Sequence, residues 1–158
     1  MTLELEQSSY KQFTLCLIIK DDEVLLAKKK RGRDEGKWNG YGGKPNEGES
    51  LKQAAIREAQ EEGNVTPKNL EIYGQVNYHT PWNMAVTVYL VREWDGIPQE
   101  TEEMGEPQWF KTNELPQEIH EGDRGWWQKI LSGEKVKVDF YYDEMGKQKE
   151  AVFGRPKQ

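Results

Sequence analysis

Runs of apolar residues separated by short polar turns recur along the chain and predict β-strands. The first two cover residues 13–20 and 23–30, and the Asp21-Asp22 pair between them predicts a hairpin turn. The other segments with strand patterns are residues 38–43 (a short strand and turn), 70–79, 85–92, 108–111, 136–142 and 149–153, of which the last two form a hairpin.

A helical period replaces the strand pattern after Ser50. Ser50 suits an N-cap, and Gln53 three positions later has the spacing of a capping box. The helix that follows carries a narrow apolar stripe at Leu51, Ala55 and Ala59. Its pattern is broken by Pro67, beyond the helix.

A second helix is predicted near the C-terminal end of the chain. Asp123 can cap it and Gly133 ends it, and a short helical turn is expected at residues 113–116. Its apolar residues are Trp126, Trp127, Ile130 and Leu131. Strands before and after two helices predict an α/β/α sandwich with a mixed sheet, and a length of 158 residues predicts a single domain, residues 1–158.

Composition narrows the class of protein. The chain is 35% hydrophobic and 32% charged, and no apolar run approaches the roughly 20 residues of a membrane span. A net charge of −6 argues against a nucleic-acid polymer as partner. Cys16 is the only cysteine and lies in an apolar run, which predicts a core residue, and residues 1–9 lack the basic start of a secretion signal. We therefore expect a cytoplasmic, monomeric protein.

Acidic residues gather on one face of the first helix. Glu58, Glu61 and Glu62 stand at i, i+3 and i+4, where side chains are neighbours and like charges repel. Two interpretations fit these three residues alone. They form either a solvated acidic face or a site for a hard cation such as Mg²⁺, which takes carboxylate oxygens together with substrate phosphates.

The spacing around these acids favours the metal site. Six residues fit the pattern Gly-x5-Glu-x7-Arg-Glu-U-x-Glu-Glu-x-Gly-U, where U is aliphatic: Gly43, Glu49, Arg57, Glu58, Glu61 and Glu62. The chain therefore resembles the Nudix hydrolases, which cleave a nucleoside diphosphate linked to another group. It departs from the pattern at Ala59, which is small, and at Asn64, which replaces a glycine but tolerates a left-handed helix end.

This resemblance implies roles for the charged residues. Glu58, Glu61, Glu62 and Arg57 fall at catalytic positions, with Arg57 expected to pair with an acid such as Glu49. The implied ligands of Mg²⁺, or of Mn²⁺ in its place, are Gly43, Glu58, Glu61, Glu62 and Glu103. Glu102 and Glu106 are rivals of Glu103, and the motif leaves open which carboxylate is the general base.

Segments outside the motif resemble the Nudix hydrolases of oxidised purine nucleoside triphosphates. The positions that line the purine pocket in that group correspond to Thr14, Lys29, Asn39, Tyr78, Met84, Asp123 and Trp126. Asn39 and Asp123 can hydrogen-bond a base edge, and aromatic rings can stack on it. Taken alone, Trp126 at a helical position is more typical of a core residue than of a ligand contact, and Thr14 and Met84 could equally pack the sheet. Arg33, His120 and Gly122 depart from the group, and we expect His79 and His120 to be surface or loop residues.

The resemblance implies hydrolysis of 8-oxo-dGTP and similar nucleotides to the monophosphate and pyrophosphate. Such a reaction cleans the nucleotide pool and so supports DNA repair, with a small-molecule nucleotide as the partner. Two alternatives stay open. The enzyme could instead cleave a dinucleoside polyphosphate, a nucleotide sugar or a capped RNA, or the domain could bind nucleotides without turning them over.

Overall fold

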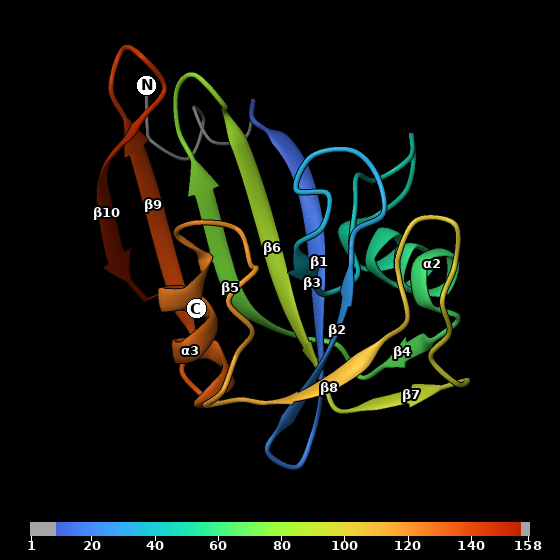
Figure 1. The fold of residues 1–158 in the computed structure, drawn as a ribbon. Coiled ribbons are helices and arrows are strands. Elements are labelled where there is room, and N and C mark those ends of the chain that lie inside the picture. The colour runs from blue at the N-terminus through green and yellow to red at the C-terminus, as the bar shows by residue number, and fades with distance from the viewer. Residues whose placement is uncertain (1–8, 156–158) are drawn as a thin grey trace.

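The computed structural model describes residues 9–155, in which eight strands form one twisted, mixed sheet (Figure 1). Residues 1–8, which carry most of the segment predicted to lack a secretion signal, lie outside the described part. The strands of this sheet are β1 (Lys11–Lys20), β2 (Glu23–Lys28), β3 (Trp38–Asn39), β5 (Glu71–Tyr78), β6 (Met84–Val91), β8 (Gln108–Lys111), β9 (Val136–Tyr142) and β10 (Gln148–Gly154).

The strand order is β10-β9-β5-β6-β1-β2-β3, and β8 pairs with β2 on a branch of this path. β1 runs parallel to β6 and β5 parallel to β9, whereas the other pairs are antiparallel. The prediction of an α/β fold with a mixed sheet is therefore confirmed. Among the described residues, no helix is long and apolar enough to cross a membrane.

A second, two-stranded sheet was not predicted. It pairs β4 (Thr66–Lys68) with β7 (Glu93–Asp95), and Pro67 lies opposite Trp94. The sequence indicated only that Pro67 breaks the helical pattern. Strands of three residues are too short to show a period of two, so the pairing depends on the tertiary fold.

The first helix, α2 (Leu51–Gly63), has the predicted caps. The Gln53 backbone N–H donates to Ser50 Oγ at 3.1 Å, and the Ser50 N–H donates to Gln53 Oε1 at 2.9 Å, which completes the capping box. Asn64 ends the helix in the left-handed region, with φ of 59°. Asn64 therefore adopts the left-handed conformation that suits the glycine of the Nudix motif at this position.

The second helix, α3 (Asp123–Leu131), begins differently from the prediction. Gly122, with φ of 93°, is its N-cap and Asp123 is its first residue, because the Asp123 carboxylate bonds Tyr78 and Trp126 instead of the helix backbone. The helical turn expected at residues 113–116 is also wrong. The Pro116 carbonyl accepts from Arg124 at 2.6 Å, and the segment forms a simple turn.

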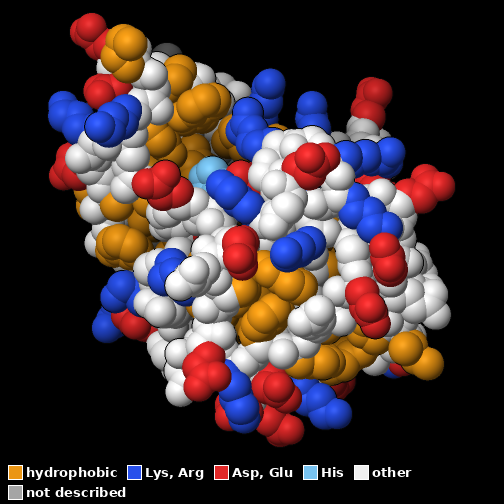
Figure 2. Space-filling view, in the orientation of Figure 1, with side chains coloured by type: hydrophobic (Ala, Val, Ile, Leu, Met, Phe, Trp, Pro, Cys, Tyr) orange, Lys and Arg blue, Asp and Glu red, His pale blue; other side chains and the backbone are white. Residues whose placement is uncertain are grey.

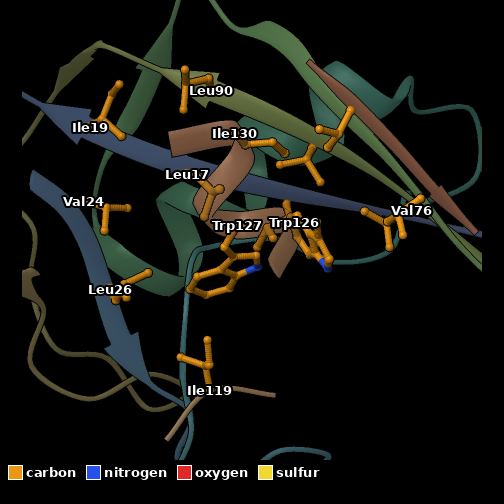
Figure 3. Packing of buried hydrophobic residues seen from close by; sticks show 14 of the residues in the cluster. Leu17, Ile19, Val24, Leu26, Val76, Leu90, Ile119, Trp126, Trp127 and Ile130 are labelled. Carbon is orange, nitrogen blue, oxygen red and sulfur yellow. The ribbon is translucent and has the colours of Figure 1, made fainter. Parts of the chain in front are cut away.

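Two hydrophobic layers position the sheet. On one face, Trp126, Trp127 and Ile130 of α3 pack against the strands around Leu17 and Val76 (Figure 3). Both tryptophans are 1% exposed, as expected for core residues.

On the other face, Ala55 and Ala59 of α2 pack against Cys16 and Tyr41. These small side chains allow the helix to lie close to the sheet. Burial raises the pKa of the Cys16 thiol to about 12, in keeping with the predicted core role.

His79 was expected to be a surface or loop residue, and it lies in the loop after β5 but is buried. It follows β5 directly and is 8% exposed. The Tyr10 hydroxyl lies 2.7 Å from His79 Nδ1, and Asp139 Oδ1 lies 2.8 Å from His79 Nε2. The ring also stacks on Tyr141. Because its polar partners, Tyr10 and Asp139, are 69 and 60 residues away in sequence, the local sequence did not reveal this burial.

Candidate active site

A glycine turn at residues 40–43 runs directly against β1. The Thr14 N–H donates to the Gly43 carbonyl at 2.8 Å, and the Cys16 N–H donates to the Tyr41 carbonyl at 2.6 Å. A Cβ on Gly42 would lie 1.9 Å from the Thr14 carbonyl oxygen, so no larger residue fits. This close approach turns the Gly42 N–H toward α2.

The buried end of the acidic face meets this turn. The Gly42 N–H donates to Glu62 Oε1 at 2.8 Å, and Glu62 is only 8% exposed. Burial raises the pKa of Glu62 to about 8, and repulsion from Glu58 and Glu103 adds to this effect. Burial also raises the pKa of Glu58, which Glu103 increases further. These three carboxylates therefore lie near enough to repel one another.

Arg57 binds the rest of the acidic cluster. Its guanidinium makes a two-point contact with Glu49, at 2.9 and 3.0 Å, which confirms the expected pairing. Its Nη1 also donates to Glu58 Oε1 at 2.8 Å and to Glu61 Oε2 at 3.2 Å. Arg57 consequently fixes the orientation of two acids on its own helix while it holds the loop before the helix.

The donor set has the chemistry that a hard divalent cation requires, namely several carboxylate oxygens beside a backbone turn. Within residues 9–155, however, no three acidic, histidine or cysteine side chains are arranged closely enough to hold a metal ion. Glu103 instead accepts from Arg31 at 3.2 Å, and the Glu61 side chain is 60% exposed. The metal site therefore stays a prediction.

A cleft of about 1250 Å³ lies beside these acids. Figure 2 shows hydrophobic side chains gathered in the upper part of this face, bordered by lysine and arginine side chains. The cleft contains Gly43 and Glu62 and all seven residues of the predicted purine pocket, which are Thr14, Lys29, Asn39, Tyr78, Met84, Asp123 and Trp126. Arg57, Glu58, Glu61 and Glu103 are not among its lining residues.

Hydrogen bonds from neighbouring groups hold Asp123 and Asn39, two polar residues of the predicted purine pocket. Asp123 is 7% exposed, and its Oδ1 accepts from the Tyr78 hydroxyl at 3.2 Å and from Trp126 Nε1 at 3.1 Å. Burial raises the pKa of Asp123 to about 6. Asn39 Oδ1 accepts from the Gly40 N–H at 2.8 Å.

The cleft also includes Asp34, Trp82 and Tyr142, which the sequence did not single out. Asp34 Oδ1 lies 2.9 Å from His120 Nδ1, which joins two loops at the wall of the cleft. Arg33 lies over the Trp82 ring, 5.3 Å from its centre, and Trp82 also contacts Tyr142 edge to face. The one feature of the sequence that could have indicated these contacts was Trp82, a tryptophan in a short loop. The other pairs join segments far apart in sequence and leave no local pattern.

Comparison with known proteins identifies the family and the fold of the chain. The NUDIX domain model matches residues 11–130. Oxidized purine nucleoside triphosphate hydrolase from Mus musculus is 33% identical over 141 residues, which cover 87% of this chain and 90% of that protein. The protein of the same name from Danio rerio is 39% identical over 109 residues, or 67% and 69% of the two chains. The crystal structure of a MutT protein from Bacillus halodurans superposes with a TM-score of 0.74 at 25% identity, covering 90% of this chain and 97% of that one.

Proposed function

This chain belongs to the NUDIX family of hydrolases, and on that premise we propose that it hydrolyses oxidised purine nucleoside triphosphates. The products are the nucleoside monophosphate and pyrophosphate, and 8-oxo-dGTP is the expected substrate. The names of the Mus musculus and Danio rerio relatives support this substrate class. The biological role that follows is removal of damaged nucleotides from the pool before they enter DNA.

One observation carries the proposal. A single cleft contains Glu62 and the Gly42–Gly43 turn together with the two base-reading side chains, Asn39 and Asp123. A purine held by Asn39 and Asp123 can therefore extend its phosphates along the cleft toward the acidic cluster. Lys29 lines the same cleft and supplies positive charge for the phosphate chain.

The acidic residues have a common task in this proposal. Glu58, Glu62 and Glu103, with Glu61 and the Gly43 carbonyl, would hold a divalent cation, Mg²⁺ or Mn²⁺. When bound, such an ion neutralises phosphate charge and lowers the pKa of a water molecule. Glu61, the most exposed carboxylate that Arg57 contacts, would either complete this ligand set or share in taking the proton of the attacking water.

The Gly42 N–H fixes one oxygen of Glu62, and Arg57 fixes one oxygen of Glu58. Each acid therefore keeps a second oxygen for the cation. We also propose that the enzyme works as a cytoplasmic monomer made of one domain, and the match of the NUDIX domain model to residues 11–130 supports the single domain.

A substrate panel tests the proposal. The values of kcat/KM would be measured by pyrophosphate release for 8-oxo-dGTP, dGTP and 2-hydroxy-dATP, and by product analysis for diadenosine tetraphosphate. We expect the oxidised purines to be preferred at least tenfold over dGTP. A preference for diadenosine tetraphosphate would show that the cleft serves a different Nudix reaction.

The variant Glu62→Gln separates an enzyme from a binding module. We expect it to lose hydrolysis while it retains nucleotide affinity, because the amide preserves size but removes the charge that a cation requires. Hydrolysis at the wild-type rate would exclude Glu62 from the metal site.

A further inference from the structure

The carboxylate of Asp123 is held by one of its two oxygens. Oδ1 accepts both the Tyr78 hydroxyl, from the end of β5, and the Trp126 indole N–H, from the first turn of α3. Both groups are donors, and both favour the ionised carboxylate. Because two donors converge on Oδ1, the second oxygen, Oδ2, is the atom of Asp123 available to a ligand in the cleft.

Asn39 is oriented as a hydrogen-bond donor, which complements the acceptor at Asp123. Its amide oxygen accepts the Gly40 N–H at 2.8 Å, so its NH₂ group is the part that can donate to a base. The pocket therefore presents a fixed donor at Asn39 and an ionised acceptor at Asp123. A purine that fits both must offer a carbonyl or bare nitrogen to the first and an N–H to the second.

We propose that Tyr78 is a positioning residue that keeps Asp123 as an acceptor, so that the pocket selects purines presenting an N–H, as guanine does at N1. This inference rests on the proposed function and assigns its specificity to one hydroxyl group. Tyr78 is itself fixed, because its ring stacks on Phe140 with centres 5.3 Å apart. The hydroxyl therefore reaches Asp123 from a rigid position on the sheet.

Other charged groups also face Asp123. His120, in the loop before α3, favours its ionised form, whereas burial and Asp34, from the loop between β2 and β3, oppose it. Tyr142, on β9, has its pKa raised to about 12 by burial and by Asp123. The pKa of Asp123, about 6, results from all of these effects, and the Tyr78 hydrogen bond is one of those that lower it. Its removal should leave Asp123 protonated at a higher pH.

The test compares wild type with Tyr78→Phe on two substrates from pH 5 to 9. The first is 8-oxo-dGTP, whose base carries N1–H, and the second is 8-oxo-dATP, which has a bare nitrogen at that position. We expect the acid limb of kcat/KM for 8-oxo-dGTP to move up by about one pH unit in the variant. At pH 7 the ratio of kcat/KM for 8-oxo-dGTP to that for 8-oxo-dATP should fall about tenfold. The reason is that the ratio of ionised to protonated Asp123 at this pH falls from about ten to about one.

Tyr73→Phe is the matched control, since it removes a hydroxyl from the same strand at a residue outside the cleft. It should change neither the pH profile nor the ratio. Equal losses on both substrates in Tyr78→Phe, with the acid limb unmoved, would overturn the inference and reduce Tyr78 to a packing residue. If wild type hydrolyses neither nucleotide, the proposed function fails. In that case, dissociation constants of 8-oxo-dGTP and 8-oxo-dATP, measured by calorimetry for wild type and Tyr78→Phe, decide the role of Tyr78 separately.

Discussion

Replacing Arg57 with lysine should weaken the response of the enzyme to Mg²⁺ more than its affinity for nucleotide. The guanidinium contacts Glu49 at two points, Glu58 at 2.8 Å and Glu61 at 3.2 Å, and it donates to the Lys44 carbonyl at 3.1 Å. A lysine ammonium keeps the charge but cannot reproduce a planar fork with this many directed donors. Two proposed metal ligands therefore lose their fixed orientation.

The expected loss of Mg²⁺ response can be scaled from other metal sites. Groups that orient metal ligands without touching the metal typically change metal affinity by about 10–100-fold when they are replaced. Arg57→Lys retains one or two contacts, so we expect the Mg²⁺ concentration for half-maximal activity to rise about tenfold. Arg57→Ala retains none of them and should approach a hundredfold. At saturating Mg²⁺ the KM for nucleotide should stay within about twofold of wild type, because no phosphate contact is assigned to Arg57.

The assay is pyrophosphate release titrated with Mg²⁺ at fixed nucleotide, followed by nucleotide titration at saturating Mg²⁺. Arg124→Lys provides a control, because Arg124 donates to the backbone carbonyls of Leu115, Pro116 and Gln117 and to no acid of the cluster. It should change stability without moving the Mg²⁺ curve. The reasoning fails if Arg57→Lys leaves that curve in place and raises KM instead, since Arg57 would then bind phosphate.

Three further predictions concern stability. Gly42→Ala should abolish soluble folded protein, because its Cβ would lie 1.9 Å from the Thr14 carbonyl oxygen, whereas Gly154→Ala, in open space, should keep the wild-type melting temperature. The folded pKa of Glu62, about 8, exceeds its ordinary value of 4.5, so wild type loses stability as pH rises through this interval. In metal-free buffer, urea denaturation should therefore find Glu62→Gln more stable than wild type at pH 9, by up to about 5 kcal/mol, and equal to it near pH 4. Asn64→Ala should lower the melting temperature by about 2–4 °C, because Asn64 has φ of 59°, and Asn64→Gly should not.

Features coded by neighbouring residues were predicted well. The α2 caps at Ser50 and Asn64 and the long strands depend on contacts within a few positions, so their patterns are visible in the sequence. The spaced motif likewise placed Glu58 and Glu62 on α2, and the predicted pairing of Arg57 with Glu49 is confirmed.

Features that depend on distant partners were missed or mistaken. β4 and β7 exist because segments 27 residues apart pair, as Pro67 does with Trp94. The burial of His79 depends on Asp139, 60 residues away, whose Oδ1 lies 2.8 Å from His79 Nε2. Asp123 was taken for a helix cap because its sequence context is that of a cap, yet its partner Tyr78 lies 45 residues earlier. No pattern within the α3 segment records that contact.

The start of α3 links the fold to the proposed recognition of the base by Asp123. Had Asp123 been the N-cap, its carboxylate would have accepted a backbone N–H of the helix and been lost to the cleft. Gly122 takes that position without a side chain, in a left-handed conformation that other residues adopt at a cost. A Cβ there would also lie 3.0 Å from Gln148 Oε1 on β10. A glycine at 122 therefore leaves the carboxylate of the next residue for Tyr78 and Trp126, as the proposed selection of the base by Asp123 requires.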